Sequence, residues 1–325
     1  MKGDCMEENL ISVIMTTYNE SAKELTEAVN SILDQTYPKF ELILILDDPN
    51  NSDLKKTIEA LAAVDKRIKF YINEKNMGLS RSLNRAITLA TGEFIARMDA
   101  DDISFPNRLA EERDLMIKNN YDLVTGSATF INESGKIIGS HEPILTDPIQ
   151  IAKLLPYGSN LVHPSAFFRG SVLREFKYHC YPTAEDYDLW LRLVSHHKVI
   201  GATNKEIIKY RIRQNSMTQS NKLKMFLTSQ YLRQKFVDHT LDNFDKKEYN
   251  AYLKSWGYND AFRQEFNQVT NSFSQSLKNL RKFKFSGFKN LAPLLHKRIY
   301  RDYFKNSYQY KRQYRKLLNA EQYLS

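Results

Sequence analysis

Short apolar runs and longer segments with helical spacing alternate through the first third of the chain. Four apolar runs predict β-strands: Ser12–Met15, Phe40–Leu46, Ile68–Ile72 and Phe94–Met98. The segments between them repeat apolar residues at every third or fourth position and predict helices: Lys23–Leu33, Asp53–Ala63 and Leu79–Ala90. Each parallel strand needs a crossover before it, so this alternation favours a mostly parallel sheet with helices on both faces.

The pattern becomes mixed after Tyr121. Three short β-like pieces follow one another: Leu123–Ser127, Thr129–Asn132 and Lys136–Ser140. An amphipathic helix is expected at Asp186–Ser195, and beyond Asn221 the chain is helical in pattern and rich in aromatic residues. We therefore expect an α/β domain over residues 1–220 and a helical, basic C-terminal extension over residues 221–325.

Polar residues come directly after three of the predicted strands. They are Tyr18, the pair Asp47 and Asp48, and the cluster Asp99–Asp102. In open parallel sheets, ligands bind beyond the carboxyl ends of the strands. These side chains are far apart in sequence, but we expect them to meet at one edge of the sheet.

Three carboxylates lie within four residues in the cluster Asp99–Asp102. Charges of the same sign repel one another at this spacing unless a cation lies among them. Mg²⁺ and Mn²⁺ prefer oxygen ligands and often bind carboxylates together with phosphates, and such a cation would neutralise a diphosphate leaving group. The alternative is a solvated loop in which Asp102 caps the helix entered at Pro106.

Asp47 and Asp48 end the second predicted strand. A carboxylate at this position can accept the imide N–H of a uracil ring, and Tyr18 can stack on that ring. The alternative is a turn built by the Asp-Pro-Asn sequence. Gly78 is a turn residue that would also let the backbone approach a phosphate.

Glu185 and Asp186 open the amphipathic helix. One of these carboxylates could be the general base that takes the proton from an attacking hydroxyl. The simpler explanation is a favourable interaction with the helix dipole. His163 could line an acceptor pocket or have a structural role.

The formal charge of +9 is concentrated at the C-terminal end, where residues 271–325 carry thirteen basic and two acidic residues. Nine aromatic residues lie between Lys278 and Lys316, the first and last basic residues of this segment: Phe283, Phe285, Phe288, Tyr300, Tyr303, Phe304, Tyr308, Tyr310 and Tyr314. Such a segment suits an anionic membrane surface. Packing against the α/β domain, or against a second copy in a homo-oligomer, remains the alternative. No nucleic-acid-binding module is recognised, so we expect no nucleic-acid partner.

Three features predict a cytoplasmic location, with peripheral binding at the inner face of the membrane if the basic end contacts lipid. The chain begins with a polar, acidic segment that lacks the pattern of a signal peptide. Its two cysteines do not form a disulfide framework. Its longest apolar runs are too short to span a bilayer.

Six segments, in this order, resemble the motifs of the family 2 glycosyltransferases: SVIMTTYNE, SILDQTYPKFELILILDD, NMGLSRSLNRAI, ATGEFIARMDADDISFPNRL, HPSAFFR and AEDYDLWLRL. They extend roughly over residues 11–220. The resemblance implies the GT-A fold, with a Rossmann-like sheet. It also implies a metal-dependent, inverting enzyme that transfers a hexose or N-acetylhexosamine from a nucleotide-sugar, with a UDP-sugar expected.

The resemblance also implies roles for the donor-side residues. Thr16, Tyr18 and Asp48 would hold the nucleoside. Asp99 and Asp101 stand at the acidic positions of the family's DXD motif. Asp99 would bind the ribose or the sugar of the donor, and Asp101 would bind Mn²⁺ or Mg²⁺.

On the acceptor side, the resemblance makes Asp186 the base, with Glu185, His163 and Trp190 near the acceptor. That acceptor would be a glycan or lipid-linked saccharide in surface polysaccharide biosynthesis. The chain departs from the family at Arg213, because many relatives carry a histidine shortly after the pair Tyr210-Arg211. We expect Arg213 to bind phosphate as a fixed cation.

Two other functions compete with this interpretation. A glycosyltransferase-like domain could act as a binding protein that contacts a partner through its basic end. A nucleotidyltransferase would share the sheet and the acidic metal loop, but it needs a Gly-rich loop bearing Lys or Arg after the first strand. The segment TTYNES does not supply such a loop.

Overall fold

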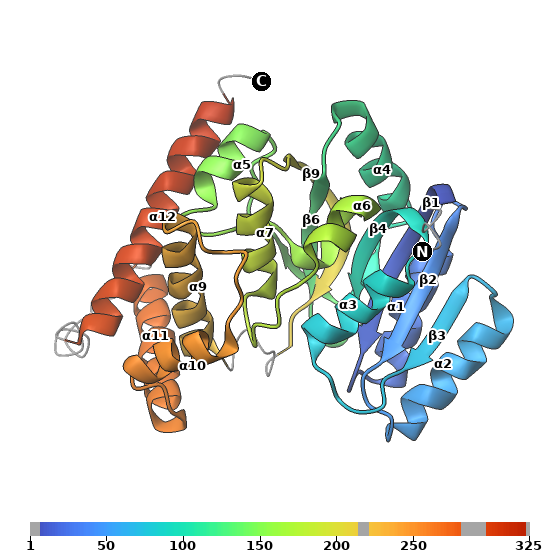
Figure 1. Ribbon diagram of the computed structural model, residues 1–325, viewed down its shortest axis with the longest axis horizontal. Helices are drawn as coiled ribbons and strands as arrows, with labels where there is room; N and C mark the ends of the chain where they lie inside the picture. The colour runs from blue at the N-terminus through green and yellow to red at the C-terminus, as the bar shows by residue number, and fades with distance from the viewer. Residues whose placement is uncertain (1–6, 214–220, 281–296, 323–325) are drawn as a thin grey trace.

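A nine-stranded sheet runs through the α/β part of the chain in the order β3-β2-β1-β4-β8-β6-β9-β5, and β7 pairs with β6 (Figure 1). The computed structural model describes residues 7–213, 221–280 and 297–322. The strands are β1 (Glu7–Thr17), β2 (Phe40–Leu46), β3 (Ile68–Ile72), β4 (Gly92–Asp99), β5 (Ile103–Ser104), β6 (Leu123–Ile131), β7 (Ile137–Ser140), β8 (Phe167–Arg169) and β9 (Ile200–Arg211).

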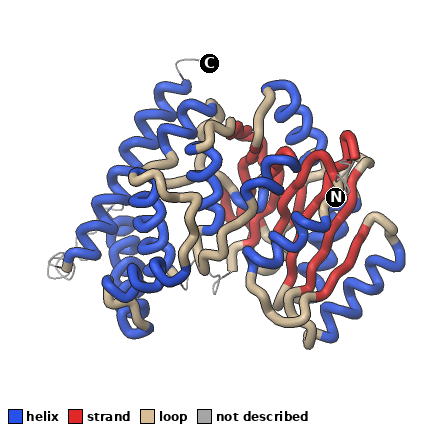
Figure 2. Tube along the Cα trace, viewed as in Figure 1, coloured by secondary structure: helices blue, strands red, loops and turns tan. Residues whose placement is uncertain are grey.

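The helices flank the sheet in the first half of the chain and gather beside it in the second half (Figure 2). They are α1 (Ala22–Leu33), α2 (Ser52–Val64), α3 (Leu79–Leu89), α4 (Arg108–Asn119), α5 (Pro148–Leu154), α6 (Gly170–Phe176), α7 (Glu185–Ser195), α9 (Lys222–Val237), α10 (Lys246–Ser255), α11 (Asp260–Leu280) and α12 (Arg298–Gln322). A short 3₁₀ helix, η1, covers His163–Ser165.

The first four strands, β1 to β4, pair in parallel, as the alternation of strands and helices predicts. β1 pairs in parallel with both β2 and β4, and β2 pairs in parallel with β3. The strand β2 is buried along its whole length, which explains its almost wholly apolar sequence. The parallel strands β1 and β4 end at Thr17 and Asp99, so the polar residues that follow them lie at the same edge.

The second half of the sheet is mixed and less visible in the sequence. β8 is antiparallel to β4 and β6, and β9 runs parallel to β6. The β-like pieces expected on either side of Ala128 are one continuous strand, β6. The sequence did not predict β9, because exposed polar residues at 204–206 interrupt its apolar pattern where its register to β6 shifts.

The C-terminal helices pack against the α/β part and share its core. One hydrophobic cluster joins Leu189 and Leu193 of α7 to Leu227 of α9, Phe266 of α11 and Tyr300 of α12. In Figure 1, α7 lies between the sheet and α9, and α12 forms the outer edge of the helical group. The predicted boundary near residue 220 falls outside the described residues and remains a prediction.

The end of α12 is tied to the segment before α5. Glu321 accepts hydrogen bonds from the backbone N–H groups of Thr146 at 2.7 Å and Asp147 at 2.5 Å. The hydroxyl of Tyr314 donates to the carbonyl of Pro143. These contacts fix α12 beside a part of the chain that precedes it by more than 160 residues.

Most aromatic residues of the basic end are used for packing where they are described. Tyr300 and Tyr314 are buried, and Tyr303, Phe304 and Tyr310 pack against the core. Tyr308 is different, since 67% of its surface is exposed. Three more of these nine aromatic residues lie outside the described residues: Phe283, Phe285 and Phe288.

Candidate active site

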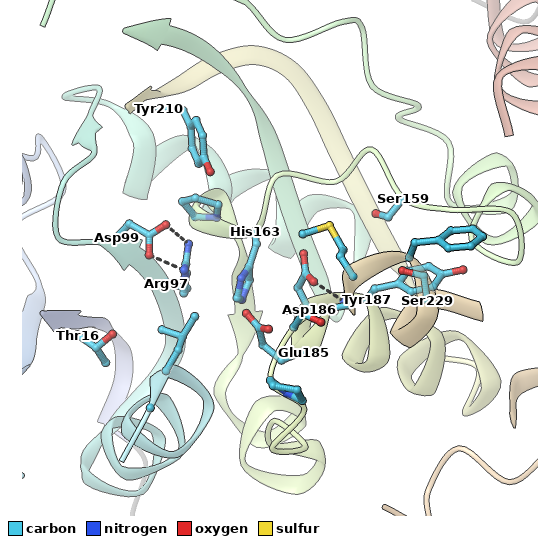
Figure 3. A pocket seen from close by; sticks show the side chains of 18 of the residues that line it. Thr16, Arg97, Asp99, Ser159, His163, Glu185, Asp186, Tyr187, Tyr210 and Ser229 are labelled. Atoms are coloured by element: carbon cyan, nitrogen blue, oxygen red, sulfur yellow. Dashed lines mark hydrogen bonds and ion pairs between the residues drawn. The ribbon is translucent and has the colours of Figure 1, made fainter. Parts of the chain in front are cut away.

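A cleft of about 920 Å³ begins at the carboxyl ends of β1 and β4 and extends to the C-terminal helices α9 and α12. Figure 3 shows Thr16 at one end and Ser229 towards the other, with Glu185 and Asp186 between them. The cleft is lined by most of the sequence-predicted site residues: Thr16, Tyr18, Gly78, Asp99, Asp101, His163, Glu185, Asp186 and Arg213. The expected convergence at the sheet edge is therefore present.

Asp47 holds the loop that precedes α3. Its buried carboxylate accepts hydrogen bonds from the side-chain amide of Asn73 at 2.6 Å and from the backbone N–H groups of Met77 and Gly78, each at 2.8 Å. Gly78 has a φ of 80°, a conformation that favours glycine. Asp47 thus fixes the loop that places Gly78 on the wall of the cleft.

Asp48 is half-buried beside this loop, and its carboxylate accepts the backbone N–H of Asn50 at 3.0 Å. It is not among the residues that line the cleft, whereas Asp47 is. Tyr18 lines the cleft with 44% of its surface exposed, so its ring is free to meet a ligand. The nucleoside-binding roles of Tyr18 and Asp48 remain predictions.

Arginines hold each carboxylate of the acidic loop. Asp99 forms a two-pronged ion pair with Arg97, with N–O distances of 2.8 and 2.5 Å, drawn in Figure 3. Asp101 pairs with Arg213 at 2.9 Å. Asp102 accepts the backbone N–H of Arg211 at 2.8 Å. The loop is therefore ordered, which argues against the solvated-loop alternative.

The acidic loop fits a divalent cation. Carboxylate oxygens of Asp99, Asp101 and Asp102 all lie within 4.8 Å of one another. Burial and the nearby charge of Asp99 raise the pKa of Asp101 to about 7. One carboxylate oxygen of Asp102, Oδ2, is buried without a hydrogen-bond partner in the described structure. A bound divalent cation would relieve both the mutual repulsion and the unpaired oxygen.

Glu185 and Asp186 form the first turn of α7, where Ala184 introduces the helix with a φ of 61°. An alanine in this left-handed conformation is strained, and such strain occurs at functional sites. The backbone N–H of Tyr187 donates to Asp186 at 2.7 Å. Burial and the charge of Asp186 raise the pKa of Glu185 to about 7, and burial also raises the pKa of Asp186.

His163 lines the cleft beside this carboxylate pair and shares a hydrogen bond of 2.9 Å with the hydroxyl of Tyr178. Burial and the positive charge of Arg97 place the pKa of His163 well below its usual value. The imidazole is therefore neutral at pH 7. A neutral imidazole can donate or accept a hydrogen bond with a ligand without adding charge to the site.

The structure corrects the placement of Trp190 in the acceptor pocket. Trp190 is completely buried, stacks on Phe168 with 5.9 Å between ring centroids, and meets the edge of His163. It is not among the residues that line the cleft. The apolar face of α7 points into the core, so Trp190 contacts His163 from the core side and not from the cleft.

Sequence reasoning gave no site role to five residues that order or line the site: Arg97, Tyr157, Arg211, Arg233 and Tyr310. Arg211 has 1% of its side chain exposed and links the acidic loop to Glu27 of α1 at 2.9 Å. Its Nε also donates to the carbonyl of Asp101 at 2.7 Å. A lone arginine in a strand gives no sequence signal for such a role.

We expect Glu185→Gln to stabilise the protein at pH 8 in the presence of EDTA. The folded pKa of Glu185 is about 7 and its ordinary value is 4.5, so ionisation of this buried side chain opposes folding. This cost begins as the pH rises above 4.5 and is complete above about 7. Thermal melts should show a gain of a few degrees at pH 8 and a smaller gain at pH 5. Equal gains at both pH values would contradict the buried ionisation.

The comparisons with known proteins agree with this geometry. The family model for glycosyl transferase family 2 matches residues 12–176. The O-antigen biosynthesis glycosyltransferase WbnJ of Escherichia coli is 34% identical over 240 residues, which cover 73% of this chain and 92% of WbnJ. The E. coli protein named UDP-Glc:alpha-D-GlcNAc-diphosphoundecaprenol beta-1,3-glucosyltransferase WfgD is 33% identical over 221 residues, 67% of this chain and 83% of WfgD.

The fold has a counterpart among solved structures. The crystal structure of S. aureus TarS 1-349 in complex with UDP-GlcNAc matches with a TM-score of 0.57 and 19% sequence identity. The match covers 75% of this chain and 70% of the TarS chain. The match to the family model over half of the chain and the identity to WbnJ show that the chain belongs to glycosyl transferase family 2, and the likeness to TarS shows that it has the GT-A fold.

Proposed function

We propose that this glycosyltransferase transfers a sugar from a UDP-sugar to a hydroxyl of a lipid-linked saccharide in surface polysaccharide biosynthesis. The observation that carries the proposal is the single cleft that joins the acidic loop of β4 to the carboxylate pair of α7. The names of WbnJ and WfgD support the pathway, and the name of WfgD also supports the donor and acceptor classes.

The donor would lie over the carboxyl ends of β1 and β4. Thr16, Tyr18 and Asp48 are proposed to hold uridine, and Asp99 the ribose or the sugar. Gly78 has no heavy atom within 4 Å of the position of a Cβ, which leaves open space for a phosphate beside the backbone. Arg213 would meet the diphosphate as a fixed positive charge.

Asp101 is proposed as the protein ligand of Mn²⁺ or Mg²⁺, with Asp99 and Asp102 close to it. A divalent cation at this position would neutralise the charge that develops on the departing diphosphate. The chain itself supplies the order of the loop. Arg211 fixes its backbone, and Arg97 holds Asp99.

Asp186 is proposed as the general base. Its carboxylate lies beyond Asp99 along the cleft, on the side of the C-terminal helices (Figure 3). An acceptor hydroxyl activated there would attack the sugar from the face opposite the diphosphate, and this single displacement inverts the anomeric carbon. Glu185 is proposed to position the acceptor.

A screen of UDP- and GDP-sugars tests the proposal directly. We expect one UDP-sugar to raise the melting temperature and to be hydrolysed slowly in Mn²⁺ without acceptor. Excess EDTA should remove both effects. Stabilisation by GDP-sugars alone, or hydrolysis that is indifferent to EDTA, would contradict the proposed donor or the proposed metal.

The outer face of α12 is proposed to bind an anionic membrane surface. Its exposed residues Arg301, Lys305, Tyr308, Arg312 and Arg315 recur at intervals of three and four, so they form one stripe along the helix. Each basic residue near an anionic surface contributes about 1 kcal/mol. No helix in the described parts of the chain is long and apolar enough to cross a bilayer.

The stripe can be tested without removing α12, whose inner face belongs to the core. Replacing the four basic residues Arg301, Lys305, Arg312 and Arg315 with Gln should abolish flotation with phosphatidylglycerol vesicles at low salt. Salt should weaken flotation of the wild type in the same way. Four exposed lysines serve as the control for lost charge: Lys55 and Lys56 on α2, which lies far from α12 in Figure 1, and Lys66 and Lys75 on either side of β3. Equal flotation of both variants would contradict the proposal.

A further inference from the structure

The far end of the cleft is built by the C-terminal extension and not by the motifs of the family. The inner face of α9 contributes Phe226, Ser229 and Arg233, and α12 contributes Tyr303 and Tyr310. This part of the chain lies beyond the residues matched by the family model. It lies on the acceptor side of Asp186, so its chemistry bears on the acceptor.

Arg233 differs from the other two arginines that line the cleft. Arg97 pairs with Asp99, and Arg213 pairs with Asp101. Arg233 is half-buried, and within the described residues no carboxylate lies at ion-pair distance from it. Its Nε donates to the hydroxyl of Tyr187 at 3.3 Å, and its guanidinium lies 6.0 Å from the ring of that tyrosine.

The contact with Tyr187 fixes the position of this cation relative to the base. Tyr187 follows Asp186 in α7, and its hydroxyl donates to the carbonyl of Leu155 at 2.6 Å, which holds the ring in place. Arg233 is therefore linked to the helix of Asp186 through a single side chain, that of Tyr187. A partly desolvated guanidinium without an anionic partner favours binding of an oxyanion.

Aromatic rings line the same cleft as this cation. Tyr310 lines both the main cleft and a second cavity of about 450 Å³ that contains His141 and Tyr314. Gly158 makes room for the Tyr310 ring, since a Cβ on this glycine would lie 2.8 Å from Cδ2 of the ring. Aromatic walls with a few polar groups are typical of ligand sites, and the flat faces of sugar rings pack well against them.

We propose that Arg233 binds an oxyanion of the acceptor, and that Tyr310 packs against an acceptor sugar ring beside it. This proposal rests on the glycosyltransferase function proposed above and adds a substrate class, a saccharide that carries a negative charge close to the accepting sugar. The phosphate of a diphospholipid carrier and the carboxylate of an acidic sugar share this chemistry. The diphosphate is favoured because it follows directly after the first sugar of a lipid-linked saccharide.

Calorimetry with the full-length protein, saturated with UDP and Mn²⁺ to occupy the donor side, tests the assignment. The probes are GlcNAc-diphospho-farnesyl, the neutral farnesyl β-GlcNAc, and farnesyl β-glucuronide. The wild type should prefer the diphosphate to the neutral probe. Arg233→Gln should weaken binding of the diphosphate by roughly 10- to 100-fold, the range for a hydrogen bond to a charged group. Binding of the neutral probe should stay unchanged.

Two further variants separate charge from packing. Lys224→Gln, on the same helix but facing the ring of Tyr258, should leave all affinities unchanged. Gly158→Ala should displace the Tyr310 ring and weaken all probes by a similar factor. A preference of the wild type for the glucuronide would support the oxyanion site with the acidic sugar as its source.

Equal affinity of the wild type for charged and neutral probes, or binding of none of them, would overturn the proposal. An equal loss for charged and neutral probes in Arg233→Gln would do the same. The donor screen reports separately on the proposed function. Arg233-dependent binding without UDP-sugar hydrolysis would therefore leave the anion site in place and reject the transferase chemistry.

Discussion

Asp101→Asn is expected to abolish measurable transfer and to weaken the binding of UDP in Mn²⁺. The removal of one preorganised electrostatic group typically lowers the rate by roughly 10²- to 10³-fold, and here the same side chain would also hold the metal. The fold should survive, because Arg213 keeps its second ion pair with Glu24 at 3.2 Å. Calorimetry of UDP binding and a coupled assay of UDP release measure the two effects.

The metal role makes a second, separable prediction for this variant. In excess EDTA, the wild type and Asp101→Asn should bind UDP with similar, weak affinity. Asp114→Asn is a matched control, since Asp114 is exposed on α4 and, within the described parts of the chain, has one ion-pair partner, Arg113 at 2.9 Å. Full activity of Asp101→Asn, or of the wild type in EDTA, would refute the metal role.

Asp186→Asn is expected to lower kcat by roughly 10²- to 10⁴-fold, the usual contribution of a general base. The KM for the donor should be nearly unchanged, because the base acts on the proton of the acceptor. Asparagine keeps the oxygen that accepts the Tyr187 N–H, so the start of α7 should be preserved. Steady-state kinetics with a saturating acceptor and a varied donor concentration separate the two parameters.

Glu185→Gln provides the decisive comparison for the carboxylate pair. Both side chains line the same cleft, and burial raises both pKa values. If Glu185→Gln lowers kcat far more than Asp186→Asn does, the base has been assigned to the wrong carboxylate. NMR of the product tests the mechanism itself, since retention of the donor's anomeric configuration would exclude a single displacement.

The donor side of the site could be predicted because its residues follow strands in a regular way. The apolar runs of β2 and β3 have the bounds that the sequence indicates, and parallel strands bring their carboxyl ends together. Asp99 and Asp101 therefore converge with Thr16 without any long-range information. The GT-A fold and the family were predicted from the same segments and are confirmed.

The acceptor side could not be predicted in this way, because no local pattern brings its residues together. Gly158, Arg233 and Tyr310 meet only when α9 and α12 pack beside α7. The sequence showed that the extension is basic and aromatic, but it could not separate the buried face of α12 from the exposed one. The prediction for Trp190 failed for a related reason, since an apolar residue in an amphipathic helix more often faces the core.

The core that α7 shares with the C-terminal helices limits how segments of this enzyme can be replaced by those of a relative. Thr183, just before the proposed base, contacts Thr228 of α9 at 3.1 Å, which contacts Tyr249 of α10 at 2.7 Å. A chimera joined near residue 220 would separate these partners and leave the carboxylate pair on an unsupported helix. New acceptor specificity would therefore have to be transplanted as α7 together with the C-terminal helices, so the proposed base would move with it.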